Sequence, residues 1–208
     1  MLPNLGRNTA PVHGKLLIVV GPSGVGKDSL IGRARQDLSD DTSVLFVRRV
    51  ITRATAMATE DHDYLPPDEF AIARASGQFA VHWNAHGLSY GIPATVRSHL
   101  HGGGVAVVNG SRAALPDFHA AFARIKIVHV TAPSEVLAAR LAGRGRESEI
   151  DISRRLQRAK IDLSRYEDWV EIDNSGPLET AAAIFVETIR HTLSETRSGP
   201  ESVEHTNS

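Results

Sequence analysis

Residues 16–29 read LLIVVGPSGVGKDS, a short aliphatic run that leads at once into a glycine-rich stretch. An apolar strand followed by G-x-x-x-x-G-K and a helix is the context of a phosphate-binding loop. The glycines let main-chain N–H groups turn toward phosphate oxygens, and the start of the helix adds a favourable field. A plain strand-to-helix turn does not need these parts in this order. We predict that phosphate is bound by the whole loop: Gly21, Pro22, Ser23, Gly24, Val25, Gly26, Lys27, Asp28 and Ser29.

The loop departs from its usual pattern at Asp28. The residue after Lys27 is usually Ser or Thr, whose hydroxyl ligates Mg²⁺, and here the hydroxyl comes one position later, at Ser29. The third β-rich run ends in Asn109, where an acidic residue would normally help to hold the metal. Two compatible interpretations of Asp28 stay open. The metal-directed carboxylate has moved from the strand end to the loop, where it binds Mg²⁺ directly or through water, or Asp28 only favours the helix start.

Short β-rich runs alternate with helical patterns along most of the chain. This alternation is typical of an α/β fold, a parallel sheet with helices on both faces and ligands at the carboxyl ends of its strands. Lys126, inside one of the runs, is expected to reach solvent from an edge strand. The predicted strands are Leu16–Val20, Val44–Val47, Val105–Asn109, Ile125–Val130 and Val170–Asp173. The predicted helices are Lys27–Leu38, Pro93–Leu100, Ser134–Ala142, Ile150–Arg165 and Leu178–Leu193.

The chain of 208 residues suits a single domain with a small insert. The alternation breaks after about residue 51, where a short helix, Asp68–Ala75, and a strand, Phe79–Trp83, are expected. This insert, about residues 51–100, should cover the same edge of the sheet as the phosphate loop. The expected divisions are a loose leader at 1–14, one domain at 15–193 with its core at 15–50 and 101–193, and a frayed polar tail at 194–208.

The composition excludes several classes of protein. The formal net charge is −1, so no global field recruits nucleic acid or an anionic membrane, and any anionic ligand must be held by local Arg and Lys. The absence of cysteine excludes disulfides, thiolate metal sites and cysteine nucleophiles. The longest apolar run, residues 16–20, is too short to cross a bilayer, and residues 1–14 do not resemble a secretory signal. We expect a cytoplasmic protein that acts on a small molecule.

An arginine-rich segment begins at the end of the helix predicted at 134–142. Phosphoryl transfer is mainly positioning plus neutralisation of spreading negative charge, and planar guanidinium groups suit that work. A glycine-flanked loop between two helices, about residues 143–150, could close over a nucleotide as a lid. Any single arginine could instead lie on a solvated helix face beside Glu or Asp, but the whole cluster favours a lid. Its members are Arg140, Arg144, Arg146, Arg154, Arg155 and Arg158.

With these pieces in place, the chain resembles the guanylate-kinase-like branch of the P-loop nucleoside monophosphate kinases over nearly all of residues 14–193. The resemblance rests on GPSGVGK, RRVITR, DEF, SYGIP, and RLAGRGRE followed by RRL. It implies that ATP lies on the phosphate loop, that the insert binds the acceptor, and that the lid supplies catalytic arginines. By position, Arg53 and Tyr90 resemble acceptor-phosphate ligands. The implied catalytic set is Lys27, Arg140, Arg144 and Arg155.

The departures from that family concern guanine recognition. Two carboxylates that typically read guanine are replaced, by Val81 in the insert and by Asn109 at the end of the third strand. A base with amidine-type N–H groups would leave donors unpaired there, which a buried site does not tolerate. Cations are rearranged as well. A second arginine of the family falls at Ala56, a serine is replaced by Arg49, and a phosphate-contacting tyrosine by His62.

These departures resemble a narrower family, the ribose 1,5-bisphosphate phosphokinases of phosphonate breakdown. The likeness includes HGLSYGIP and RGRE, and the most specific pair of motifs is GKDS with NGSRA. It implies ATP-dependent phosphorylation of the 1-phosphate, giving 5-phosphoribosyl 1-diphosphate and ADP. A base pocket can be discarded, but a second phosphate must be bound. The candidates for that phosphate are Arg49, Arg53 and Arg112, those for sugar hydroxyls are Glu60, Asn109 and Ser111, and His62 and Tyr90 complete the acceptor set.

Three functions stay open from the sequence. The sugar-bisphosphate kinase is preferred, a nucleoside monophosphate kinase with altered base preference is the first alternative, and a non-catalytic binding module is the second. A binding module would not need an intact Lys27 or lid arginines. The basic stretch at 154–160, RRLQRAK, lacks interleaved aromatic residues, so it favours a lid over a nucleic-acid site. We expect ATP and Mg²⁺ as cofactors, a sugar phosphate as substrate, and neither nucleic acid nor membrane as partner.

Overall fold

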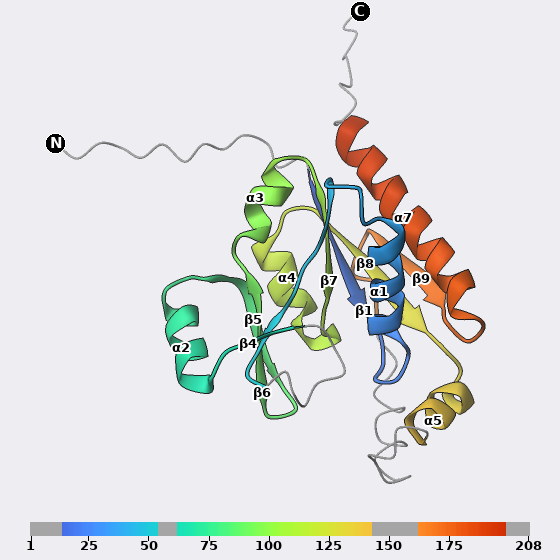
Figure 1. Ribbon diagram of the computed structural model, residues 1–208, viewed down its shortest axis with the longest axis horizontal. Helices are drawn as coiled ribbons and strands as arrows, with labels where there is room; N and C mark the ends of the chain where they lie inside the picture. The colour runs from blue at the N-terminus through green and yellow to red at the C-terminus, as the bar shows by residue number, and fades with distance from the viewer. Residues whose placement is uncertain (1–13, 54–61, 143–161, 199–208) are drawn as a thin grey trace, which may run out of the picture.

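The computed structural model describes residues 14–53, 62–142 and 162–198, and its centre is a sheet of five strands (Figure 1). The strand order is β2-β7-β1-β8-β9, and every neighbouring pair is parallel. The predicted parallel sheet is therefore confirmed, and each of the five strands predicted for it agrees with the structure to within one residue at either end. The strands are β1 (Lys15–Val20), β2 (Val44–Phe46), β7 (Val105–Asn109), β8 (Ile125–Thr131) and β9 (Trp169–Asp173).

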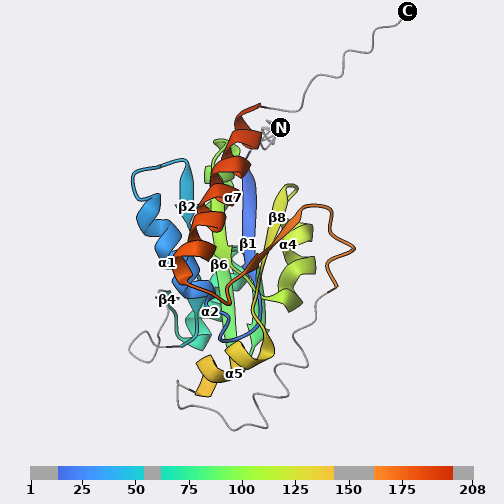
Figure 2. The ribbon, with the colours of Figure 1, turned by 90° about the vertical axis from the view of Figure 1, so that its right-hand side faces the viewer.

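Helices cover both faces of this sheet, as predicted. Figure 2 shows the sheet between α1 and α7 on one side and α4 on the other. On the α4 side, α3 packs beside it, and a short 3₁₀ helix, η2, leads from β7 into α4. The helix α5 follows β8 and lies below the carboxyl ends of the strands in Figure 1. Their bounds are α1 (Lys27–Asp37), α3 (Val96–His101), η2 (Arg112–Ala114), α4 (Leu115–Ala121), α5 (Ser134–Ala142) and α7 (Leu178–Ser198).

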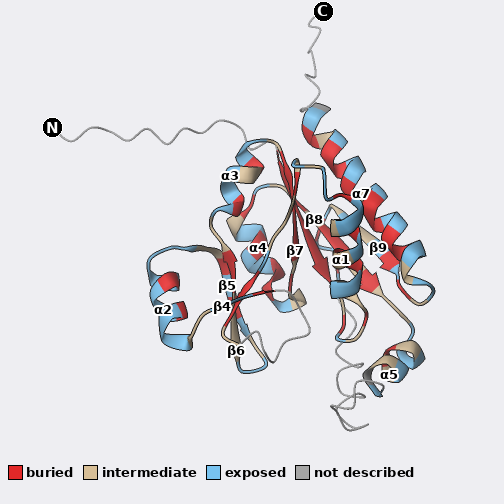
Figure 3. Ribbon diagram, in the orientation of Figure 1, coloured by how far each residue is buried: buried red, intermediate tan, exposed pale blue. Residues whose placement is uncertain are grey.

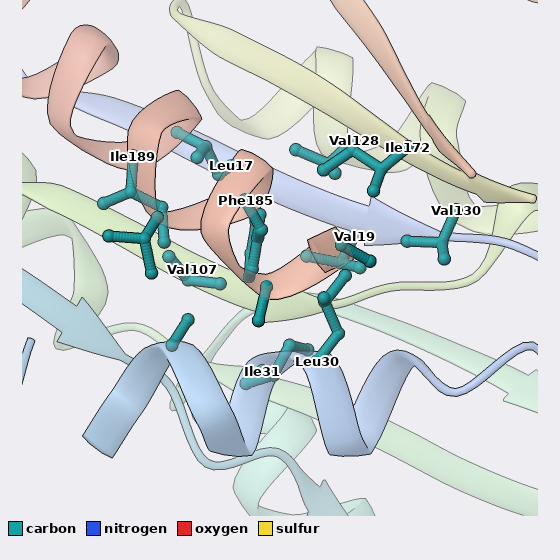
Figure 4. Close-up of a cluster of buried hydrophobic side chains, with 14 of the residues drawn as sticks. Leu17, Val19, Leu30, Ile31, Val107, Val128, Val130, Ile172, Phe185 and Ile189 are labelled. Carbon is teal, nitrogen blue, oxygen red and sulfur yellow. The ribbon is translucent and has the colours of Figure 1, made fainter. Parts of the chain in front are cut away.

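The core consists of two apolar layers, one on each side of β1. Every residue of β1 is buried. Leu17 and Val19 face α1 and α7, where Phe185 of α7 fills the centre of the layer (Figure 4). Leu16 and Ile18 face α3 and α4. A strand that is apolar on both faces belongs in the interior of a parallel sheet, which is where β1 lies. In Figure 3 the buried residues follow these strands and the inner sides of α1, α4 and α7.

The insert contains a second sheet that the sequence patterns largely missed. Its four strands run in the order β4-β3-β6-β5, with α2 beside them. The hairpin between β5 and β6 turns at His86 and Gly87, both with positive φ, as tight hairpin turns require. The strands β3 and β4 have only two residues each and give no periodic signal, and the six-residue β6 was also not predicted. The bounds are β3 (Val50–Ile51), β4 (Asp63–Tyr64), α2 (Pro67–Ala75), β5 (Phe79–Ala85) and β6 (Leu88–Pro93).

Several predicted boundaries are wrong. The helix α7 ends at Ser198, so residues 194–198 are helical and not a frayed tail, and Thr196 in this stretch is buried. Gly14 is not part of a loose leader, since it is buried and its N–H donates to Leu100 O of α3. That helix packs in one apolar layer with β7 and with the insert strands β5 and β6. Residues 162–165, predicted to end a helix, form loop and turn, and the rest of that prediction, 150–161, lies outside the described residues.

Within residues 14–53, 62–142 and 162–198, no helix is both long enough and apolar enough to cross a membrane.

Candidate active site

The phosphate loop joins β1 to α1, and its shape depends on two glycines and an asparagine. Gly24 and Gly26 have φ values of 82° and 94°, which a residue with a side chain rarely adopts. A Cβ on Gly26 would lie 2.6 Å from Nδ2 of Asn174. That buried amide follows β9 and donates to Val25 O at 2.7 Å, so it holds the loop from below. Sequence reasoning missed Asn174, whose only signal was its place directly after a predicted strand.

Lys27 is the first residue of α1 and bends back over the loop. Its Nζ donates to the main-chain oxygens of Gly21 at 3.0 Å and of Pro22 at 3.1 Å. The ammonium group therefore lies against the start of the loop, and the main-chain N–H groups of the first turn of α1 follow at its end. A phosphate in the loop would meet both kinds of donor. This geometry is compatible with phosphate binding by Lys27. Its catalytic role stays a prediction.

Asp28 contacts Asn109, although 81 residues separate them in the chain. Nδ2 of Asn109 donates to Oδ1 of Asp28 at 2.5 Å. The two positions that the sequence hypothesis linked, an unusual acid on the loop and a missing acid at a strand end, are thus direct neighbours. Asp28 also lies in the first turn of α1, so the helix-start interpretation remains compatible with this contact.

Arg49, on the segment between β2 and β3, reaches the same strand end from the side of the insert. It is buried, and its Nη1 donates to the main-chain oxygen of Asn109 at 2.9 Å. Its guanidinium lies 5.4 Å from the centre of the Tyr90 ring, and that ring stacks on Trp83 at 5.3 Å. Two predicted acceptor residues, Arg49 and Tyr90, are therefore in contact with each other and joined to the end of β7.

Arg53 and His62 form a second unit in the insert. The ring nitrogen Nε2 of His62 lies 2.9 Å from Arg53 O and must carry the proton, because a carbonyl oxygen only accepts. His62 is buried, so the structure places it behind Arg53 as a support for the main chain. Among the described residues, Nε of Arg53 is buried without a hydrogen-bond partner. Glu60, predicted for a sugar hydroxyl, lies outside the described residues.

Arg112 and Ser111 follow β7 on the face covered by α4. Arg112 is half-buried, and burial lowers the pKa of its guanidinium from the ordinary value. Its neighbour His129 on β8 escaped the sequence reasoning. Burial lowers the pKa of this imidazole, Arg112 lowers it further, and Glu171, whose Oε2 lies 3.5 Å from Nδ1, acts in the opposite direction. The environment therefore favours a neutral His129 beside a charged arginine.

Arg140 is the predicted catalytic arginine that the structure describes. It lies in the last turn of α5, and its Nη1 donates to Val25 O at 3.3 Å, so α5 is tied to the phosphate loop. Arg144 and Arg155, together with the proposed lid at 143–150, fall outside the described residues. In the part of the chain that the structure describes, no three His, Asp or Glu side chains gather as a metal cluster. A metal at this site would depend on Asp28, phosphate oxygens and water.

Comparisons with known proteins place the chain among named relatives. Residues 16–166 match the family model described as an AAA domain, more than half of the chain. The ribose 1,5-bisphosphate phosphokinase PhnN of Agrobacterium fabrum is 46% identical over 175 residues, which are 84% of this chain and 96% of that protein. The enzyme of the same name from Rhizobium etli is 47% identical over 183 residues, covering 88% of this chain and 93% of that protein.

A bifunctional protein and a solved structure extend the comparison. The bifunctional ribose 1,5-bisphosphokinase-thymidine phosphorylase of Cupriavidus necator is 43% identical over 85% of this chain, but over only 29% of that longer protein. The crystal structure of guanylate kinase from Anaplasma phagocytophilum superposes with a TM-score of 0.61, covering 87% of each chain at 19% identity. At that identity the likeness concerns the fold alone, and it confirms the expected guanylate-kinase-like architecture.

Proposed function

This chain belongs to the family of ribose 1,5-bisphosphate phosphokinases, and we propose that it transfers the γ-phosphoryl group of ATP to ribose 1,5-bisphosphate. Within the site, the proposal is supported by the absence of a carboxylate at positions 109 and 81, which hold Asn109 and Val81. The amide of Asn109 is bound to Asp28, and Val81 is buried in the apolar layer of α4. Neither position offers a carboxylate to a guanine base, so the guanylate kinase alternative is not favoured.

In the proposed reaction, an oxygen of the 1-phosphate attacks the γ-phosphorus of ATP. A new P–O bond forms, the bond from the γ-phosphorus to the oxygen bridging to the β-phosphorus breaks, and ADP leaves with that oxygen. The products are 5-phosphoribosyl 1-diphosphate and ADP. Lys27 exchanges its contacts with Gly21 O and Pro22 O for phosphate oxygens, and Arg140 neutralises charge beside it. The described catalytic pair is completed, in our proposal, by Arg144 and Arg155.

The acceptor would be held mainly by cations. Arg53 and Tyr90 are the candidates for the phosphate that reacts, and Arg49 and Arg112 for the second phosphate. Planar guanidinium groups bind phosphate with two parallel hydrogen bonds, which fixes orientation as well as charge. Ser111 and Glu60 are the candidates for sugar hydroxyls. Asn109, first considered for the same task, has its amide nitrogen committed to Asp28.

The residues present fit a bound Mg²⁺. This ion usually takes one or two carboxylates and completes its shell with phosphate oxygens and water. Asp28 is exposed and offers a carboxylate on the loop itself, directly before the hydroxyl of Ser29. When bound, the metal would neutralise charge on the β- and γ-phosphates. We place the reaction in the cytoplasm, where ATP is available and where a protein without cysteine needs no disulfide.

The proposal is tested by measuring ADP release from ATP with ribose 1,5-bisphosphate and, separately, with GMP. We expect turnover with the sugar bisphosphate, formation of 5-phosphoribosyl 1-diphosphate in equal amount to ADP, and little turnover with GMP. Strong GMP turnover without sugar-bisphosphate turnover would overturn the assignment.

The variant Arg112→Ala tests the acceptor site. An unchanged KM for the acceptor and an unchanged kcat would remove Arg112 from it.

A further inference from the structure

We propose that Asn109 is a positioning residue that couples the two halves of the active site. Its side chain orients the Asp28 carboxylate on the phosphate loop, and its main chain anchors Arg49 on the acceptor side. The inference rests on the proposed function for the meaning of the two halves. The contacts that carry it are independent of the substrate.

The position of Asn109 is fixed by the sheet. It is the last residue of β7 and pairs in register with Val19 of β1. The next residue, Gly110, donates its N–H to Val19 O at 2.9 Å. A Cβ on Gly110 would lie 2.5 Å from Cγ2 of Ile18, so the chain is packed directly on β1 at this point. Asn109 therefore presents its side chain from a rigid base.

The chemistry of the contact assigns the orientation of the amide. A carboxylate oxygen can only accept, so the atom of Asn109 that faces Asp28 must be the NH₂ group. The amide oxygen then points the other way. Among the described residues this Oδ1 is buried without a hydrogen-bond partner. An orphaned buried acceptor is unfavourable, so the bond on the other side of the amide must offset that cost. The gain lies in the charge-assisted bond to Asp28, which is stronger than a neutral one.

The main chain of the same residue reaches the other half of the site. Arg49 donates to Asn109 O, and its guanidinium lies against Tyr90. A continuous series of contacts therefore connects Asp28 on the phosphate loop, through Asn109 and Arg49, to the insert. The carboxylate of Asp28 and the guanidinium of Arg49 are held to one fixed residue. Their separation is then set by a single strand end, and in-line phosphoryl transfer depends on such fixed distances.

The contact also explains why an amide stands at the strand end. Two carboxylates at this separation would repel each other strongly. With Asp at position 28, the partner at 109 must be neutral and able to donate. We infer that positions 28 and 109 act as a unit with one carboxylate and one neutral partner. The opposite distribution, Ser at 28 and Asp at 109, satisfies the same requirement.

The test compares Asp28→Ser, Asn109→Asp and the double exchange with the wild type, using the full chain. Urea unfolding without any ligand measures stability, and the Mg²⁺ concentration for half-maximal ATP binding, measured by calorimetry, reports on the loop. We expect Asn109→Asp to raise the unfolding equilibrium constant about 10-fold, through repulsion between adjacent carboxylates. Adding Asp28→Ser should restore most of the stability that Asn109→Asp loses. We expect the kcat of the double variant to exceed that of Asn109→Asp at least about 5-fold.

The matched control is Asn84→Asp, which makes the same charge change in the insert. Asn84 is exposed, and its Oδ1 accepts from the Ser89 hydroxyl, a bond that aspartate can keep. We expect changes of less than about 2-fold in each measurement. If the effects of Asp28→Ser and Asn109→Asp simply multiply, positions 28 and 109 are not a unit and the proposal fails.

A further variant keeps the proposal testable if Asn109→Asp does not fold. Asp28→Asn leaves two amides that can still bond to each other, so we expect a smaller loss of stability than in Asn109→Asp. The Mg²⁺ midpoint for ATP binding should rise at least about 10-fold, because the oriented carboxylate is lost. An unchanged midpoint would overturn the role of the pair. The stability coupling needs no substrate, so it can hold even if ribose 1,5-bisphosphate proves not to be the acceptor.

Discussion

The two ends of the central sheet carry their charges in different ways. At the amino end, Lys15 is largely buried and its Nζ lies 2.8 Å from Asp168 and 2.7 Å from Glu195. Lys126 joins the same group, 3.0 Å from Asp168. Cations and carboxylates there neutralise one another directly. They join the start of β1, β8, the approach to β9 and the last turns of α7.

At the carboxyl end, three cations donate to main-chain carbonyl oxygens. Lys27 donates to Gly21 O and Pro22 O, Arg140 to Val25 O, and Arg49 to Asn109 O. A carbonyl fixes the direction of a cation without cancelling its charge. Cations oriented toward the loop in this way would attract an anionic ligand. We therefore expect the charges at the amino end to stabilise the fold and those at the carboxyl end to bind phosphate.

The pKa values at the amino end follow from this pairing. Burial alone would raise the pKa of Asp168, but its bonds to Lys15 and Lys126 hold that pKa below the ordinary value. For Glu195, burial likewise acts upward, while the bond to Lys15 lowers its pKa overall. Burial opposes the charge on Lys15, yet its two carboxylate partners raise its pKa above the ordinary value.

The largest effect is expected from Lys27→Met at the carboxyl end. Loss of one charged donor at a reacting phosphate should lower kcat about 10²- to 10³-fold. The free energy of unfolding should change by less than about 1 kcal/mol, because the side chain lies over an open loop. Steady-state kinetics and urea unfolding on the same preparation measure both. Near-normal kcat would show that Lys27 does not act on the transferred group.

The matched substitution at the amino end, Lys15→Met, should behave in the opposite way. Asp168 and Glu195 lose their shared partner inside a partly buried site. The free energy of unfolding should fall by about 2–3 kcal/mol, between the values for exposed and fully buried pairs. The kcat should stay within about 2-fold of the wild type, since the site lies at the other end of the sheet. A large loss of kcat in a folded Lys15→Met variant would break the distinction between the two ends.

The smallest effect concerns pH. Asp168 and Glu195 have lowered pKa values in the folded protein, so their contribution is present above their unfolded values, about 3.8 and 4.5, and is lost as the pH falls further. The raised pKa of Lys15 gives a contribution that is present below 10.5 and is lost as the pH rises above it. Lys15→Met should therefore flatten the dependence of Tm on pH between about 5 and 3. Parallel Tm profiles for the variant and the wild type would contradict this account.

The phosphate loop could be predicted because its strand, glycines, lysine and helix are adjacent in the chain. The structure confirms the five-stranded parallel sheet for a similar reason, since each long strand carries its own apolar run. The two-residue strands of the insert have no such run. The prediction for Lys126 was wrong. Strand β8 lies between β1 and β9, and the ammonium group pairs with Asp168 instead of reaching solvent from an edge.

The sequence by itself determined the chemistry of the loop and posed the question of Asp28. An acid on the loop and an amide at a strand end were visible as two separate departures from a common pattern. Only the tertiary structure decided that they form one contact, because β7 pairs beside β1 and brings Asn109 to the loop. The same holds for Asn174 beneath the loop and for His129 beside Arg112. Local sequence encodes strands, turns and helix starts, whereas contacts between distant residues depend on strand order, which is set by how the whole core packs.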